Sequence, residues 1–171
     1  MTQMPVTNWP ERIALTLLVI AVMVAVFVAM RRGWVARGRR QAHIPAPATR
    51  VGDQGSALLQ LPGRFIGTST HGDWLDRVVV HDLGVPSRAT LLVHPQGVHF
   101  RREGARDVAI PVEDIVEVKL SDAVGADVVD HAIVITWALG SVTLDTGFRA
   151  STAEGHAVGI SAITSVVAGK G

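Results

Sequence analysis

The sequence predicts a mainly β protein with one membrane-spanning helix near its N-terminus and a second helix at its C-terminus. Residues 13–30 form an apolar stretch of the length that a bilayer requires. Residues 60–150 alternate between short runs of β-type residues and turn residues, which is typical of small all-β domains. From residue 152 the apolar residues recur with helical spacing. We therefore expect a small β-barrel, or a pair of orthogonal sheets, closed at one end by the terminal helix.

The apolar stretch, IALTLLVIAVMVAVFVAM (13–30), contains no charged residue, and Thr16 is its only polar side chain. As an α-helix it is about 27 Å long, close to the hydrocarbon thickness of a bilayer. A cleaved signal peptide is the alternative. However, the next residues, RRGWVARGRR (31–40), place positive charge where a cleavage site of small residues is required. We therefore interpret the stretch as a retained, single-pass anchor.

Arginine is concentrated on the C-terminal side of this stretch. Arg12 alone precedes it, and five arginines follow closely: Arg31, Arg32, Arg37, Arg39 and Arg40. The positive-inside rule then predicts that residues 1–12 lie outside the plasma membrane and that the rest of the chain is cytoplasmic. The same five arginines are expected to contact lipid headgroups. Three alanines spaced four residues apart are a candidate seam for a homodimer: Ala21, Ala25 and Ala29.

Charge separates the next two parts of the chain. Residues 31–59 read as a basic linker, and its segment QAHIPAPAT (41–49) is typical of an extended stem. Residues 51–171 carry 14 acidic and nine basic side chains, so this domain is acidic and is not expected to bind nucleic acid. Because 14 of the 16 basic residues in the chain are Arg, we attribute the frequency of Arg to codon bias and infer no function from it.

The β-type runs predict seven or eight strands between residues 60 and 150. They are residues 64–68, 77–81, 90–94, 98–101, 107–110, 115–120, 131–139 and 142–145. The turn sequence 95–97 (PQG) indicates a tight hairpin. Trp137 lies within an apolar run and is expected in the core. Ser151 and Glu154 have the spacing of a capping box for a helix over residues 152–167. Two glycines lower its intrinsic helix propensity, so we expect docking on the strands to hold it.

Four segments of the chain are distinctive: GDWLDRV (72–78), LLVHPQGVHFRREGARD (91–107), IPVEDIVEV (110–118) and ITWALGSVTLDTGFRA (135–150). Together with the N-terminal helix and the basic linker, they resemble the actinobacterial membrane-anchored PH-like (pleckstrin-homology-like) domain family. The resemblance covers most of the chain and implies a PH-like barrel capped by a C-terminal helix. It implies no particular activity. The expected domain comprises residues 60–171.

The first loop between strands, residues 68–76 (TSTHGDWLD), is acidic, whereas phosphoinositide-binding PH domains carry a Lys/Arg cluster there. We therefore do not expect lipid recognition by that pocket. Trp74 is the notable aromatic of the loop. An exposed Trp74 would bind a partner or the membrane, and a buried one would close the end of the barrel. Asp73, Trp74 and Asp76 are the predicted partner-binding residues.

The sequence carries no recognisable catalytic motif. Asp73 and Asp76 have the chemistry of paired general acids or bases, although carboxylates in such a loop more often cap turns. The histidines lack the spacing of metal ligands. No GxSxG motif is present, and the chain has no cysteine. We therefore predict no catalytic residue, no metal site and no cofactor.

The leading hypothesis is a non-catalytic module that binds a protein or peptide at the cytoplasmic face of the membrane. A groove between an edge strand and the terminal helix is a candidate site for such a peptide. Two alternatives stay open. The chain could be an accessory subunit of a membrane transport or export complex, or a membrane-tethered hydrolase that uses Asp73 and Asp76.

Overall fold

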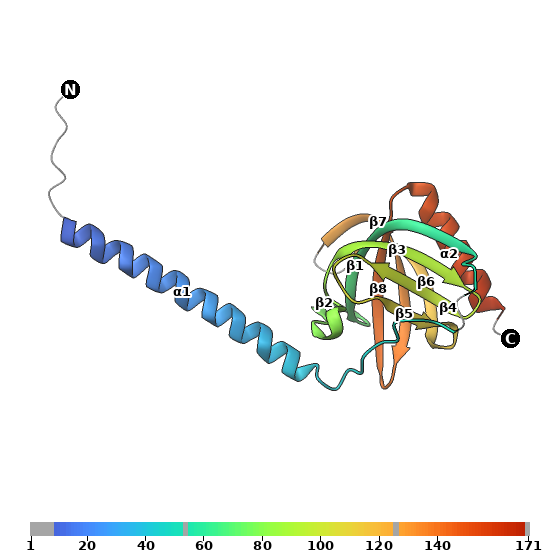
Figure 1. Ribbon diagram of the computed structural model, residues 1–171, viewed down its shortest axis with the longest axis horizontal. Helices are drawn as coiled ribbons and strands as arrows, with labels where there is room; N and C mark the ends of the chain where they lie inside the picture. Colours follow the sequence, from blue (N-terminus) through green and yellow to red (C-terminus); the bar gives the residue numbers. More distant parts are fainter. Residues whose placement is uncertain (1–8, 53–54, 125–126, 170–171) are drawn as a thin grey trace, which may run out of the picture. The chain divides into compact units, whose positions relative to one another are not determined.

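The structure is a computed structural model that describes residues 9–52, 55–124 and 127–169, without the side chains of residues 122–130. The chain divides into two units between Arg40 and Gln41. The first is a single helix, and the second is a β domain with a terminal helix (Figure 1). Most of the predicted extracytoplasmic segment, residues 1–8, lies outside the described residues.

Helix α1, Trp9–Arg40, contains the predicted apolar stretch and extends beyond it at both ends. It is long and apolar enough to cross a membrane. Its polar Thr16 donates a hydrogen bond from Oγ1 to the carbonyl of Arg12 at 2.8 Å, which satisfies the hydroxyl within the helix. Residues 31–40, expected to begin an extended linker, are helical because Arg and Ala favour helix and no proline interrupts them.

The strands form one open antiparallel sheet in the order β5-β4-β3-β1-β8-β7-β6, with β2 paired to the end of β1. Their bounds are β1 Leu59–Thr70, β2 Asp73–Arg77, β3 Ser87–His94, β4 Gly97–Arg102, β5 Val108–Pro111, β6 Ile115–Val124, β7 Asp127–Leu139 and β8 Val142–Ala150. The predicted fold class, mainly β with a terminal helix, is confirmed. Strand β1 pairs with both β3 and β8 and carries an irregularity between Phe65 and Gly67, so one strand joins the two halves of the sheet.

The prediction of a strand over residues 77–81 is wrong. The strand, β2, ends at Arg77, and Val80–Asp82 form a short 3-10 helix in which His81 has a φ of 57°. Tertiary contacts override the β propensity of this segment, because a hydrogen bond of 2.9 Å joins His81 Nε2 to the Ile44 carbonyl oxygen. Residues 68–76, expected as a loop, belong instead to the end of β1, a two-residue turn at 71–72, and β2.

The core lies between the inner face of the sheet and the terminal helix. The Phe65 and Phe100 rings meet edge to face with centroids 5.3 Å apart, and the Phe148 ring lies 5.8 Å from that of Phe100. Trp137 is buried, as predicted, and its Nε1 donates to Thr146 Oγ1 at 2.8 Å. The buried indole therefore keeps its hydrogen bond.

Helix α2, Ala153–Ala168, confirms the predicted terminal helix, although its cap is Thr152 and not Ser151. Thr152 Oγ1 accepts a hydrogen bond from the Gly155 amide at 3.1 Å. The buried Gly159 explains how the helix approaches the sheet. A Cβ at this position would lie 2.7 Å from Ile133 Cδ1 and 2.9 Å from Leu61 Cδ1. The lower helix propensity of glycine is thus offset by close docking, as the sequence predicts.

Residues 41–52, which we call the strap, pack on the β domain. The sequence predicted a free, extended stem for this part of the linker. Gln41, Ile44 and Val51 of the strap are buried. The Gln41 side chain accepts a hydrogen bond from the Val79 amide at 2.8 Å and donates one to the Arg77 carbonyl at 3.1 Å. Further along, the Ala48 carbonyl accepts from the Ala109 amide of edge strand β5 at 2.7 Å.

A buried histidine, His94, is expected to make the stability of the domain sensitive to acid. His94 on β3 is 4% exposed, and neither ring nitrogen has a hydrogen-bond partner within the described part of the chain. Burial lowers the pKa of His94, and the neighbouring His99 lowers it further. The unfolded chain therefore binds a proton more readily than the folded domain once the pH falls below about 6.5.

We expect the free energy of unfolding to fall between pH 7 and pH 5, and His94→Leu to reduce this fall, because the variant has no titrating group at this position. Urea unfolding of the full chain in detergent, at several pH values, measures the effect. An unchanged pH slope in His94→Leu would show that other groups cause the acid sensitivity.

Candidate functional site

The predicted partner-binding residues lie on the short strand β2. Trp74 and Leu75 are adjacent there and are 53% and 61% exposed. The structure therefore agrees with the interpretation of Trp74 as an exposed side chain and not with that of a buried plug. Strand β2 pairs with the end of β1 through Ser69 and Thr70. The pair Trp74–Leu75 is thus an exposed apolar surface on a short hairpin whose pairing has an irregularity between Ser69 and Thr70.

The two aspartates beside Trp74 are engaged with their own chain. Asp73 Oδ1 accepts hydrogen bonds from the amides of Leu75 at 3.1 Å and Asp76 at 3.3 Å. Asp76 Oδ2 accepts from Thr70 Oγ1 at 2.8 Å, and its Oδ1 accepts from Gln41 Nε2 at 3.4 Å. These contacts shape the hairpin and fasten the strap, which is the structural role that the sequence also allows for them.

The histidine of the same hairpin pairs with a different carboxylate. His71 Nδ1 donates to Asp145 Oδ1 on β8 at 3.0 Å, and Thr136 Oγ1 donates to the same oxygen at 2.6 Å. The His71 ring is therefore oriented toward β8. A hydrolytic site built from Asp73 and Asp76 would need its histidine from elsewhere.

The two ends of the sheet differ in how they are covered. The edge of β5 is partly occupied by the hydrogen bond from the Ala109 amide to the strap. Strand β6, the other end of the sheet, has β7 as its one neighbour among the described strands. Two apolar side chains of β6 are prominently exposed, Val116 at 65% and Leu120 at 48%. The second edge is thus open and carries two exposed apolar side chains.

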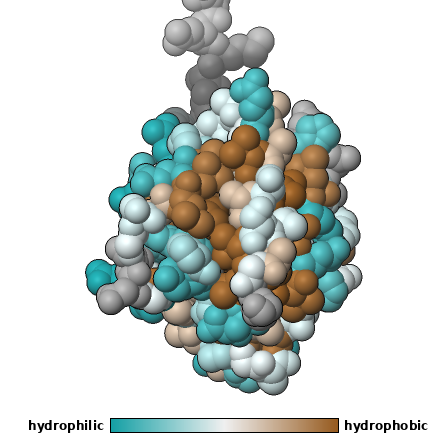
Figure 2. Space-filling model, turned by 90° about the vertical axis from the view of Figure 1, so that its right-hand side faces the viewer, coloured by the Kyte–Doolittle hydropathy of each residue, from teal (hydrophilic) through white to brown (hydrophobic). Residues whose placement is uncertain are grey.

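Helix α2 packs against β6 and also exposes an apolar side chain. Glu154 is its one charged residue, and Val158 is 49% exposed. Surface helices normally carry a charged face, so a helix of this composition is typical of one that contacts a partner. Figure 2 shows hydrophobic residues gathered on the side of the domain on which α2 lies. We call the surface formed by Val116, Leu120 and Val158 the edge surface.

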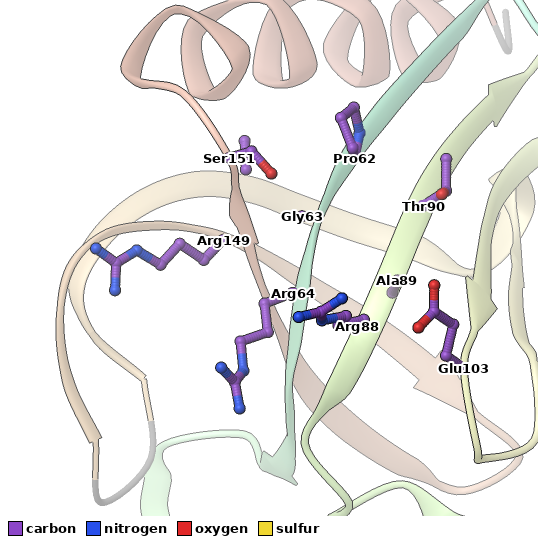
Figure 3. Close-up of a pocket in the computed structure, with 10 residues that line it drawn as sticks. Pro62, Gly63, Arg64, Arg88, Ala89, Thr90, Glu103, Arg149 and Ser151 are labelled. Carbon is purple, nitrogen blue, oxygen red and sulfur yellow. The ribbon is translucent and has the colours of Figure 1, made fainter.

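A third feature, which the sequence analysis missed, is an open hollow of about 580 Å³ on the outer face of the sheet. It is lined by arginines from three neighbouring strands, Arg64 on β1, Arg88 on β3 and Arg149 on β8 (Figure 3). The signal in the sequence is an Arg at an outward position of each strand. We overlooked this signal because we attributed the frequency of Arg to codon bias. The strand register that brings the three arginines together cannot be deduced from the sequence.

The comparison with protein families agrees with this architecture. Residues 41–164 match the family model described as Bacterial PH domain-like. The match begins where the strap begins and includes every strand and most of α2. No curated protein matches the chain. The chain therefore belongs to the bacterial PH domain-like family.

Proposed function

We propose that the chain is a membrane-anchored, non-catalytic module whose PH-like domain binds a protein segment along β6, beside α2. The observation that carries the proposal is the edge surface, where the edge strand β6 adjoins a nearly uncharged helix. An extended peptide can add to such an edge through main-chain hydrogen bonds, and its side chains then contact the neighbouring helix. Val116, Leu120 and Val158 are placed to receive apolar side chains of that peptide.

Proteins usually protect an open edge strand with charge, proline or a covering segment. The strap protects β5 in this way. In the segment 115–121 of β6, the charged side chains are Glu117 and Lys119, which pair with each other at 3.4 Å. Their mutual pairing reduces the repulsion that an incoming strand would meet, which supports β6 as the binding edge.

Helix α1 supplies the anchor in this proposal. Its five arginines at residues 31–40 would contact lipid headgroups and hold the domain on the cytoplasmic side. Attachment to the membrane raises the concentration of the domain near membrane-bound partners, so a weak contact at the edge surface suffices. Pairing of two anchors through Ala21, Ala25 and Ala29 stays a prediction.

Site-specific photocrosslinking tests the proposal. A photoreactive amino acid replaces Leu120 in the full chain in native membranes, and Val85, 41% exposed in the loop before β3, is the matched control. We expect protein adducts from position 120 and none from position 85. In a second experiment the photoreactive amino acid replaces Val116. Its adducts should disappear when the same chain also carries Leu120→Lys, because this substitution places a charge on the edge of β6.

Three further outcomes would contradict the proposal. Adducts from Trp74 alone would move the binding surface to β2. Adducts from Ala25 of α1 alone would make the chain a subunit docked through its membrane helix. Equal labelling from positions 120 and 85 would show that the edge surface has no specific partner.

A further inference from the structure

The three arginines of the hollow lie opposite one another in the sheet. Arg64 is in register with Arg88 of β3 on one side and with Arg149 of β8 on the other. All three side chains are exposed. Because neighbouring strands are about 4.8 Å apart, the row crosses only about 10 Å of sheet. Like charges directly opposite each other destabilise a sheet, so this arrangement carries a cost in stability.

The chain itself does not neutralise this row. Within the described part of the chain, none of the three guanidinium groups forms a salt bridge or a hydrogen bond. Two other arginines show the contrast. Arg77 donates to the carbonyls of Gly84 and Ile66, and Arg102 donates to several oxygens. The fold thus satisfies its structural arginines and leaves the row unpaired.

The chemistry of the hollow indicates the ligand. Guanidinium groups present planar donor pairs that match the oxygens of phosphate and carboxylate groups. One acidic residue, Glu103, also lines the hollow, so the four charged residues carry a net charge of about +2 at neutral pH. A net charge of about +2 matches a phosphate monoester, which carries close to two negative charges, better than it matches a single carboxylate, which carries one. The hydroxyl-bearing residues Thr90 and Ser151 line the same hollow and add hydrogen-bonding groups.

We infer that the row Arg64–Arg88–Arg149 is a binding site for a phosphate-bearing ligand, on a lipid headgroup or on a soluble compound. Figure 3 shows Arg149 pointing away from Arg64 and Arg88, and its unpaired side chain is free to turn toward a bound anion. The residues that line the site differ from those of the acidic hairpin at residues 68–76 and from those of the edge surface on β6 and α2. The site does not depend on the proposed function.

Binding to the full chain, embedded in nanodiscs of neutral lipid, tests the inference. Inorganic pyrophosphate is the soluble probe, and isothermal titration gives its Kd. We expect Arg64→Gln to weaken pyrophosphate binding at least tenfold, since one charge-assisted interaction contributes about a factor of 10 to 100. Lys119→Gln, which removes a positive charge on β6, should leave the Kd unchanged.

A second measurement separates loss of ligand from loss of fold. Without ligand, Arg64→Gln should be at least as stable to heat as the unmodified chain, because it relieves repulsion across β8, β1 and β3. Pyrophosphate should raise the melting temperature of the unmodified chain and not that of the variant. Equal Kd values for the unmodified chain and Arg64→Gln, or no pyrophosphate binding by the unmodified chain, would overturn the inference.

Lipid composition distinguishes the two sources of phosphate. Discs containing phosphatidic acid, whose headgroup is a phosphate monoester, are compared with discs containing a fatty acid at the same negative charge density. Weaker pyrophosphate binding in phosphatidic acid discs alone identifies the headgroup as the ligand of the row. Equal binding in both identifies a soluble phosphate compound.

Discussion

Arg102→Met is expected to destabilise the β domain by about 3 to 5 kcal/mol, because it removes a buried charge that several oxygens share. Arg102 is 6% exposed, and its guanidinium carbon Cζ lies 4.1 Å from the centroid of the Phe65 ring. Its guanidinium donates to the Asp82 and Arg106 carbonyls, each at 3.0 Å, and to Ser87 Oγ, also at 3.0 Å. Methionine is uncharged and has no donor, so it removes the cation over the Phe65 ring and leaves these acceptors without their hydrogen bonds.

Electrostatics supports the same expectation. Burial lowers the pKa of Arg102, and the carboxylates of Asp82 and Asp107 act in the opposite direction. Arginine stays protonated in proteins, so the buried side chain remains a cation that fastens the loop before β3 to the loop after β4. Lysine offers one compact ammonium group in place of the planar fork, so Arg102→Lys should also destabilise the domain.

The neighbouring Arg101 provides the control. Arg101 lies on the same strand, is exposed, and has no hydrogen bond or salt bridge to another described residue. Arg101→Met should change the free energy of unfolding by about 0.5 kcal/mol or less. Urea unfolding of the full chain in detergent, followed by near-ultraviolet circular dichroism, measures both variants. Similar unfolding midpoints for the two would show that the buried network contributes little.

Elements encoded by local sequence signals were predicted well. The hairpin between β3 and β4 follows from its turn residues, and the strands β6, β7 and β8 follow from apolar runs of the length and alternation that strands require. Helix α2 follows from the helical spacing of its apolar residues, although the sequence predicted Ser151 as the N-cap and the structure has Thr152, one residue later. In each case neighbours in the chain specify the structure.

Features set by contacts between distant residues were not predicted. The strap contains two prolines and resembles a free stem, yet Gln41 bonds the backbone 36 and 38 residues further along the chain. The strand expected at residues 77–81 ended at Arg77 because the segment after it is held by strap residues. Composition alone gives no indication of such pairings.

The candidate sites show the same difference between local signals and contacts of distant residues. A groove between an edge strand and the terminal helix was expected; β6 is an edge strand beside α2 and exposes Leu120, and the groove itself stays a prediction. The arginine row was missed because Arg64 is 24 residues from Arg88 and 85 residues from Arg149, and only the sheet register aligns them. A site formed across strands requires knowledge of pairing, whereas a site within one loop does not.

Gly97→Ala is expected to destabilise the domain by about 3 kcal/mol, from backbone strain and overpacking together. Gly97 follows the turn between β3 and β4 and has a φ of +144°, which L side chains rarely adopt. A Cβ there would lie 2.2 Å from the Ile110 carbonyl oxygen and 2.9 Å from the Val112 nitrogen. These atoms belong to the backbone, so relief of the clash requires β5 to move away from β4.

Gly104→Ala separates the two causes. Gly104 also has a positive φ, +73°, but an added Cβ would meet nothing within 4 Å. It should therefore show the conformational strain alone, about 1 kcal/mol. Hydrogen exchange adds a local readout, because displacement of β5 in Gly97→Ala should speed exchange of the Ile110 amide. If the two variants unfold at the same urea concentration, close approach of β5 is not the reason for glycine at position 97, and the tight pairing of this sheet edge would need another explanation.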